Sequence, residues 1–86
     1  MSAKESDEST GSVTQTKRLL DMKDNESGFI RVNADRKSTE MGLFPGVRVV
    51  MFRNRKTEQS LVIGAGDARF LISRAIAKDI EVDLHG

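Results

Sequence analysis

The chain has 86 residues, enough for one compact core but too few for a second, so a substrate cleft between two lobes is not expected. Its 14 Lys and Arg residues and 13 Asp and Glu residues leave a formal net charge of +1, which by itself favours neither nucleic acid nor a strongly charged partner. The absence of Cys excludes disulfide frameworks, zinc ribbons and thiol nucleophiles, and it fits a reducing compartment.

Residues 1–16 are rich in Ser, Thr, Glu and Asp, and Val13 is their only sizeable aliphatic side chain after Met1. They cannot bury enough apolar surface to offset the entropy lost on ordering, so we predict a disordered tail followed by one domain over residues 17–86. This N-terminus also lacks the apolar stretch of a secretory signal, and no run of roughly 18 apolar residues could span a bilayer. We therefore expect a cytoplasmic protein that does not insert into a membrane.

In the domain, frequent turn signals separate short segments, as is typical of a small all-β barrel. The apolar residues of 19–22 predict a short first strand, and the polar run 23–26 predicts the turn that closes it. A second strand follows Gly28. Its two-residue period places Ile30 and Val32 on one face, so both are predicted core residues.

The middle of the chain predicts a short helix and a central strand. Asp35 can accept hydrogen bonds at the start of a helix over 36–41, and Gly42 suits the left-handed residue that ends it. The Pro-Gly pair at 45–46 matches a type II turn. Residues 47–52 are apolar on most of both faces, which favours a central position in the sheet.

The last third predicts a polar hairpin loop over 53–58, further strands and one helical turn that begins after Ser73. The strands are expected over 61–63, 68–72 and 80–84, the last with one buried face. The predicted fold class is therefore mainly β, with five to six short strands, one short helix and one helical turn.

Residues 41–46, Met-Gly-Leu-Phe-Pro-Gly, resemble the signature of the ferrous iron transport protein A family (FeoA-like), whose members are small cytoplasmic SH3-like barrels. Upstream, Leu19 with 21–23 and the Glu-Ser-Gly run 26–28 look like the opening strand of this family and its turn. Downstream, 80–82 look like its closing strand. The resemblance implies an SH3-like barrel.

The resemblance covers residues 17–84 and implies a role in bacterial ferrous iron uptake. The partner it implies is the cytoplasmic part of the ferrous iron permease, a FeoB-like membrane protein, which the chain would bind and modulate without transporting metal itself. A similar barrel forms the C-terminal domain of iron-dependent repressors of the diphtheria-toxin type, which leaves a metal-binding or regulatory domain as an alternative. Residues 1–16 do not predict a DNA-reading helix before this barrel.

The sequence departs from the family pattern at three places. Ser38 and Thr39 stand where members usually have apolar residues, Asp-Asn at 24–25 stands where they have Pro-Gly, and Gly-Ala-Gly at 64–66 replaces a longer strand. The first departure matters most, because two hydroxyls weaken both a core role and a contact role for the predicted helix.

The predicted partner surface is the short helix and the turn after it, where apolar and charged residues share a loop-rich edge. Its candidate residues are Arg36, Lys37, Glu40, Leu43, Phe44 and Pro45. For Leu43 and Phe44 the alternative is plain core packing, which we favour for both. An exposed strand edge could also pair with a second copy of the chain.

Glu81, Asp83 and His85 lie at i, i+2 and i+4, so a strand would project all three from one face as a candidate transition-metal site. We favour the alternative that this is the solvent face of an edge strand, and we expect that no cofactor is required. Catalysis is not expected, because the only His is the penultimate residue and Cys is absent.

Nucleic-acid binding is the main alternative from another class of function, since residues 53–56, Arg-Asn-Arg-Lys, form a compact basic loop. We favour a solvated hairpin tip, because the chain has no Tyr or Trp and its four Phe do not interleave with the basic run. Nucleic acid is therefore not the expected partner.

Overall fold

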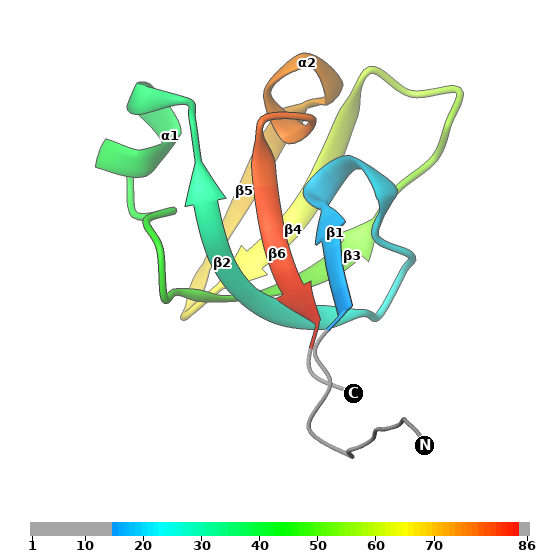
Figure 1. The fold of residues 1–86 in the computed structure, drawn as a ribbon. Helices are drawn as coiled ribbons and strands as arrows, with labels where there is room; N and C mark the ends of the chain where they lie inside the picture. Colours follow the sequence, from blue (N-terminus) through cyan, green and yellow to red (C-terminus); the bar gives the residue numbers. More distant parts are fainter. Residues whose placement is uncertain (1–14, 85–86) are drawn as a thin grey trace, which may run out of the picture.

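The computed structural model describes residues 15–84 as one curled antiparallel sheet of six strands with two short helices (Figure 1). The sheet order is β1-β6-β2-β3-β4-β5. In chain order the elements are β1 (Gln15–Arg18), the 3-10 turn η1 (Leu19–Asp21), β2 (Ser27–Asn33), α1 (Arg36–Glu40), β3 (Arg48–Arg53), β4 (Ser60–Ala65), β5 (Ala68–Ser73), α2 (Arg74–Ala77) and β6 (Ile80–Leu84). The mainly β prediction is confirmed.

The start of the domain differs from the sequence prediction. Leu19 and Leu20 form η1 rather than a strand, and Met22 follows as its C-cap, with Leu19 and Met22 each 1% exposed. The first strand is instead the polar β1, which is held by pairing with β6 far along the chain. Gln15 and Thr16, predicted to lie in the tail, belong to this strand. The rest of the predicted tail, 1–14, lies outside the described residues.

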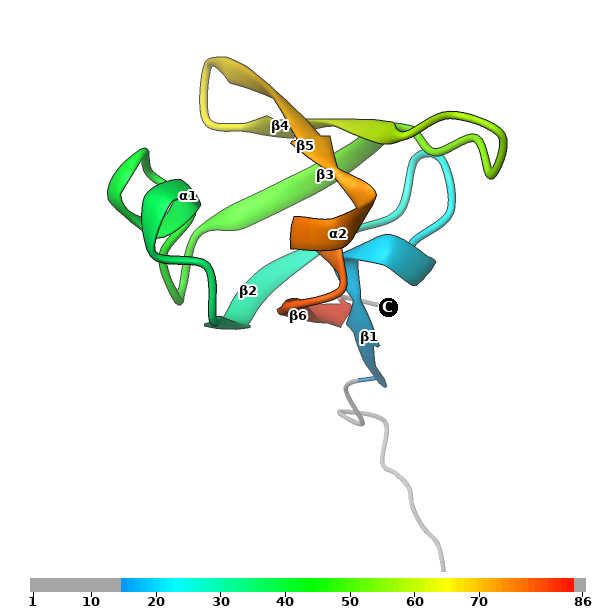
Figure 2. The ribbon, with the colours of Figure 1, turned by 90° about the horizontal axis from the view of Figure 1, so that it is seen from above.

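The core fills the inside of the curled sheet. Its side chains come from every strand of the described chain except β1, together with η1, α2 and the segment after α1. They are Leu19, Met22, Ile30, Leu43, Val49, Met51, Leu61, Ile63, Ile72, Ala77, Ile80, Val82 and Leu84. α2 contacts β4 and β5 on one side and η1 on the other, so it covers the opening between the two ends of the sheet (Figure 2).

Val32 is not a core residue, contrary to the prediction. It is 46% exposed, whereas Ile30 is 3% exposed. A bulge in β2 explains the difference, because the register against β6 shifts between the pairs Ile30–Val82 and Val32–Glu81. The extra residue turns the remainder of the strand over, which a two-residue period cannot anticipate.

β3 lies between β2 and β4, so its predicted central position is confirmed. The outward face of this strand carries Phe52, whose ring packs over Gly64 of β4. A Cβ built on Gly64 would lie 2.5 Å from Phe52 Cε2, so the aromatic ring occupies the space that a side chain would need. This close packing gives a physical reason for glycine at 64 where the family pattern has a longer strand.

Both predicted helix caps are present. The Asp35 side chain accepts from the Ser38 N–H at the start of α1, and the Ser73 hydroxyl accepts from the Ile76 N–H at the start of α2. Gly46, with φ of 95°, fits the predicted turn after Pro45. The alternation in β6 is also confirmed, but β6 lies between β1 and β2 and is therefore not the edge strand we expected.

Candidate functional site

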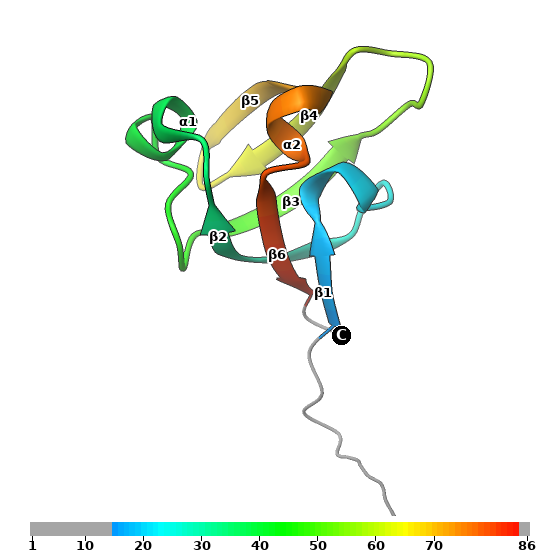
Figure 3. The ribbon, with the colours of Figure 1, turned by 45° about the horizontal axis from the view of Figure 1, so that its top comes forward.

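α1 and the turn into β3 hold the predicted partner-binding residues at one end of the sheet (Figure 3). Leu43 is fully buried in the core, so it leaves the candidate surface. Phe44 is 51% exposed, contrary to the packing role that we favoured for it. Pro45 is exposed beside it. Two adjacent residues of one motif therefore point in opposite directions, one into the core and one into solvent.

Met41 belongs to the same surface and was not among the predicted contact residues. It caps the C-terminus of α1 and is 57% exposed. Met41, Phe44 and Pro45, here called the apolar trio, lie within five consecutive positions. The sequence signal for Met41 is its place in the same motif, next to the glycine at which the helix ends. Because Met41 lies where the helix ends, no helical repeat in the sequence predicts whether its side chain is exposed.

α1, which precedes the apolar trio in the chain, carries three exposed charged side chains. Arg36 Nε lies 3.2 Å from Glu40 Oε2 across one helical turn, with both side chains well exposed. Such a surface pair contributes about 0.3–0.5 kcal/mol to helix stability. Lys37 is exposed, and no carboxylate of residues 15–84 lies within ion-pair distance of it. The predicted residues Arg36, Lys37 and Glu40 are therefore all exposed, as a contact role requires.

Asn33 fixes the backbone on both sides of α1. Its Nδ2 donates to Ser38 Oγ at 2.9 Å and to the Leu43 carbonyl at 2.8 Å, and its Oδ1 accepts from the Asp35 N–H at 2.8 Å. Ser38 is only 4% exposed. Where the family pattern has apolar residues, this chain therefore buries a hydroxyl whose hydrogen bonds are satisfied.

Asp35 completes this network. It accepts the Ser38 N–H on Oδ2 at 2.8 Å, and its carbonyl accepts the Thr39 hydroxyl at 2.7 Å. The Ser38 N–H, followed by the Ser38 hydroxyl, lowers the pKa of Asp35 below its ordinary value, because both hydrogen bonds favour the charged carboxylate. Thr39, the other residue of this departure from the family pattern, likewise holds the helix start through its hydroxyl.

Of the three candidate metal ligands, the structure describes Glu81 and Asp83 of β6, and their metal-binding role stays a prediction. Asp83 Oδ1 accepts the Thr16 hydroxyl at 2.7 Å and lies 3.7 Å from Arg31 Nη1, while Glu81 pairs in register with Arg18. His85 lies outside the described residues. Within residues 15–84, no three His, Cys, Asp or Glu side chains are close enough to hold one metal ion.

The basic loop between β3 and β4 is largely neutralised by its own neighbours. Arg53 makes two hydrogen bonds to Glu58, at 2.9 and 2.6 Å, and Arg55 Nη1 lies 2.6 Å from Asp24 Oδ2. The Arg53 guanidinium in turn lowers the pKa of Glu58. Two of the three cations that suggested nucleic-acid binding therefore already have carboxylate partners.

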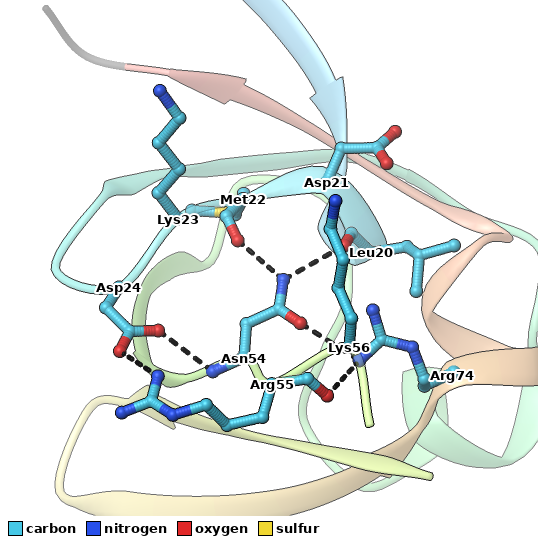
Figure 4. Close-up of a pocket in the computed structure, with 9 residues that line it drawn as sticks. All are labelled: Leu20, Asp21, Met22, Lys23, Asp24, Asn54, Arg55, Lys56 and Arg74. Carbon is cyan, nitrogen blue, oxygen red and sulfur yellow. Dashed lines mark hydrogen bonds and ion pairs between the residues drawn. The ribbon is translucent and has the colours of Figure 1, made fainter. Parts of the chain in front are cut away.

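Asn54 in the same loop joins three segments of the chain (Figure 4). Its Nδ2 donates to the Leu20 and Met22 carbonyls at 3.0 and 2.6 Å, and its Oδ1 accepts from Arg74 at 3.0 Å. Its backbone N–H donates to Asp24 Oδ1. Sequence reasoning missed this residue, because an Asn in a polar loop gives no sign of long-range partners.

β1 and β5 end the sheet, so each has a neighbouring strand on one side only within the described chain. Leu71 of β5 is 74% exposed. Self-association through such an edge stays a prediction. Over residues 15–84 no helix is both long and apolar enough to cross a membrane.

The comparisons with known proteins agree on one fold. The model of the FeoA domain family matches residues 17–84. A crystal structure of an iron uptake regulatory protein, FeoA, superposes with a TM-score of 0.76 at 21% identity, over 83% of this chain and 100% of that one. FeoA of Stenotrophomonas maltophilia was crystallised with zinc and is described as an SH3 domain protein. It superposes with a TM-score of 0.68 at 22% identity, over 84% of this chain and 91% of that one.

A manganese-dependent transcriptional repressor contains a similar domain, with a TM-score of 0.74 at 18% identity, over 85% of this chain and 44% of the repressor. A search of the curated proteins found no match. The six antiparallel strands and the superposed FeoA structures identify the fold as SH3-like. With the family model matching nearly all of the described residues, the chain belongs to the FeoA domain family.

Proposed function

We propose that this chain is a non-enzymatic accessory protein of bacterial ferrous iron uptake, which binds the cytoplasmic part of a FeoB-like iron permease and modulates it from the cytoplasm. The family membership supports the pathway. The observation that carries the contact itself is the apolar trio, which is exposed on a rigid support. The proposed contact surface is the trio with Arg36 and Lys37 at its rim.

The composition of this surface supports a protein contact. Aromatic residues and Met are enriched at the centres of interfaces, where a polar rim excludes water around them. Phe44 provides such a centre, while the rim charges would set orientation and association rate. Asn33 holds Ser38 of α1 and the Leu43 carbonyl, and the Leu43 side chain anchors the segment in the core. Little ordering entropy would therefore be lost on binding.

The proposal includes neither catalysis nor a required cofactor. Asp24 and Glu58, the carboxylates beside the basic loop 53–56, are paired with arginines, which favours structural roles for them. Transition-metal binding through Glu81, Asp83 and His85 is a separate proposal, which titration of the full chain with Fe(II) or Zn(II) tests. Loss of metal binding in His85→Ala would support this proposal. The same heat of binding in His85→Ala and in the wild type would refute it.

Nucleic-acid binding is less well supported, because Arg53 and Arg55 are paired and the loop carries no aromatic residue. Passage over heparin and polynucleotide at low salt tests this alternative. Retention that falls steeply with salt would favour nucleic acid over the permease.

The direct test is a pull-down from membranes of the source cell with tagged full-length protein at moderate salt. Phe44→Ala is expected to lose most of the permease from the pull-down. Leu71→Ala removes another exposed apolar side chain, outside the proposed surface, and is expected to retain it. Thermal melts of both variants separate loss of contact from loss of fold. Unchanged recovery of the permease by Phe44→Ala, with unchanged stability, would refute the proposal.

A further inference from the structure

A cavity of about 550 Å³ lies at the end of the sheet away from α1, where the turn 20–24, the loop 54–56 and Arg74 of α2 meet (Figure 4). Figures 1, 2 and 3 each show α1 and this loop at opposite ends of the sheet. The cavity is therefore separate from the apolar trio, and nothing in the contact proposed above makes use of it.

The charges around this cavity are unbalanced. Its two carboxylates are already paired, Asp24 with Arg55 at 2.6 Å and Asp21 with Arg18 at 2.9 Å. Its remaining cations are Lys23, Lys56 and Arg74, and no carboxylate of the described chain lies within ion-pair distance of them. Three positive charges thus remain uncompensated at one concave surface.

The guanidinium of Arg74 is held in place before any ligand arrives. Its Nη1 donates to Asn54 Oδ1 and to the Arg55 carbonyl, each at 3.0 Å. No hydrogen bond within residues 15–84 uses its Nε or Nη2. Because Asn54 is itself tied to the Leu20 and Met22 carbonyls, the cavity wall is a connected polar network rather than a loose loop.

We propose that this cavity binds an acidic peptide segment of a protein partner, with an Asp or Glu carboxylate received by Lys56 and Arg74. Arginine matches the planar carboxylate with paired donors, and uncompensated cations favour an anionic segment by charge complementarity. The half-buried Leu20 adds an apolar side chain to the lining, which suits the aliphatic part of peptide side chains better than a bare ion.

Two further observations favour a peptide over phosphate-containing ligands. The backbone N–H groups of Lys23 and Asn54, which could cradle a phosphate, already donate to Glu26 and Asp24 at 2.7 and 2.9 Å. The lining also contains no aromatic residue on which a base could stack. A nucleotide or RNA would therefore find neither of its usual contacts.

The test is an NMR titration of the 15N-labelled full chain with N-acetyl-tetraglutamate amide, and with the matching tetraglutamine peptide. The glutamate peptide is expected to shift the amides of residues 20–24 and 54–56, and the glutamine peptide is not. The double variant Lys23→Gln/Lys56→Gln should bind about fivefold more weakly, since each exposed charge pair contributes about 0.5 kcal/mol.

The control is Arg48→Gln/Lys78→Gln, which removes the same charge from exposed positions outside the cavity and should bind as the wild type does. Both lysines of the first variant are exposed and make no ion pair within residues 15–84, so it should keep its fold. Equal weakening by the two variants would overturn the proposal, as would the absence of shifts with the glutamate peptide. Stronger binding of inorganic phosphate or of an RNA oligonucleotide at the same amides would overturn it as well.

Discussion

Replacing Asn33 by Ala should destabilise the domain and release the helix that carries the proposed contact surface. The substitution removes three side-chain hydrogen bonds, to Ser38, to the Leu43 carbonyl and to the Asp35 N–H. A typical net contribution is about 1 kcal/mol for each bond, so we expect the free energy of unfolding to fall by about 3 kcal/mol. That loss is a large part of the stability of so small a domain.

The measurement is urea unfolding followed by far-UV circular dichroism, because the chain has no Trp or Tyr for fluorescence. Gln59→Ala, at an exposed position in a loop, is the control and should stay within about 0.5 kcal/mol of wild type. The double variant Asn33→Ala/Ser38→Ala should cost less than the sum of its single variants, since each single change leaves a partner unsatisfied. A cost below about 1 kcal/mol for Asn33→Ala, or strict additivity, would refute this account of the helix.

Leu43→Ala should cost about 2–5 kcal/mol in unfolding free energy, because it opens a cavity in the core, and Phe44→Ala should cost about 1 kcal/mol or less, which chemical denaturation can compare directly. Similar costs at the two positions would contradict their opposite orientations. Acid should also weaken the domain. The N–H of Ser38 lowers the pKa of Asp35, and the N–H of Lys23 lowers that of Glu26, below ordinary values of 3.8 and 4.5. Their stabilisation is present above those values and is lost as the pH falls through the lower folded-state pKa values. Unfolding titrations between about pH 5 and 3 should show a smaller loss for Asp35→Asn than for the wild type, and an equal loss would count against the cap.

Local sequence signals were sufficient where a residue's structure depends on its near neighbours. The caps at Asp35 and Ser73, the turn at Pro45 and the alternation of β6 all follow from contacts within a few positions. These signals failed where pairing with a strand far along the chain determines the structure. β1 carries no apolar pattern and exists because it pairs with β6, and the bulge that exposes Val32 arises in pairing with the same strand.

The candidate sites show the same division. The motif around Phe44 located the surface, but only the packed core distinguishes the buried Leu43 from its exposed neighbour. The basic run at 53–56 predicted a positive loop, whereas its partners Asp24 and Arg74 come from 20–30 positions away. The Arg53–Glu58 pair lies within the loop itself, but the pairing of Arg55 with Asp24 depends on a tertiary contact that no local pattern records.

The most direct test of the proposed function is the affinity of the purified full chain for the purified cytoplasmic part of the permease. Isothermal titration of the wild type, Phe44→Ala and Leu71→Ala provides the comparison. If Phe44 is the centre of the contact, its removal should weaken binding about 30-fold, corresponding to about 2 kcal/mol, while Leu71→Ala should bind as the wild type does. Equal affinity of wild type and Phe44→Ala, or no measurable binding by the wild type, would contradict the account.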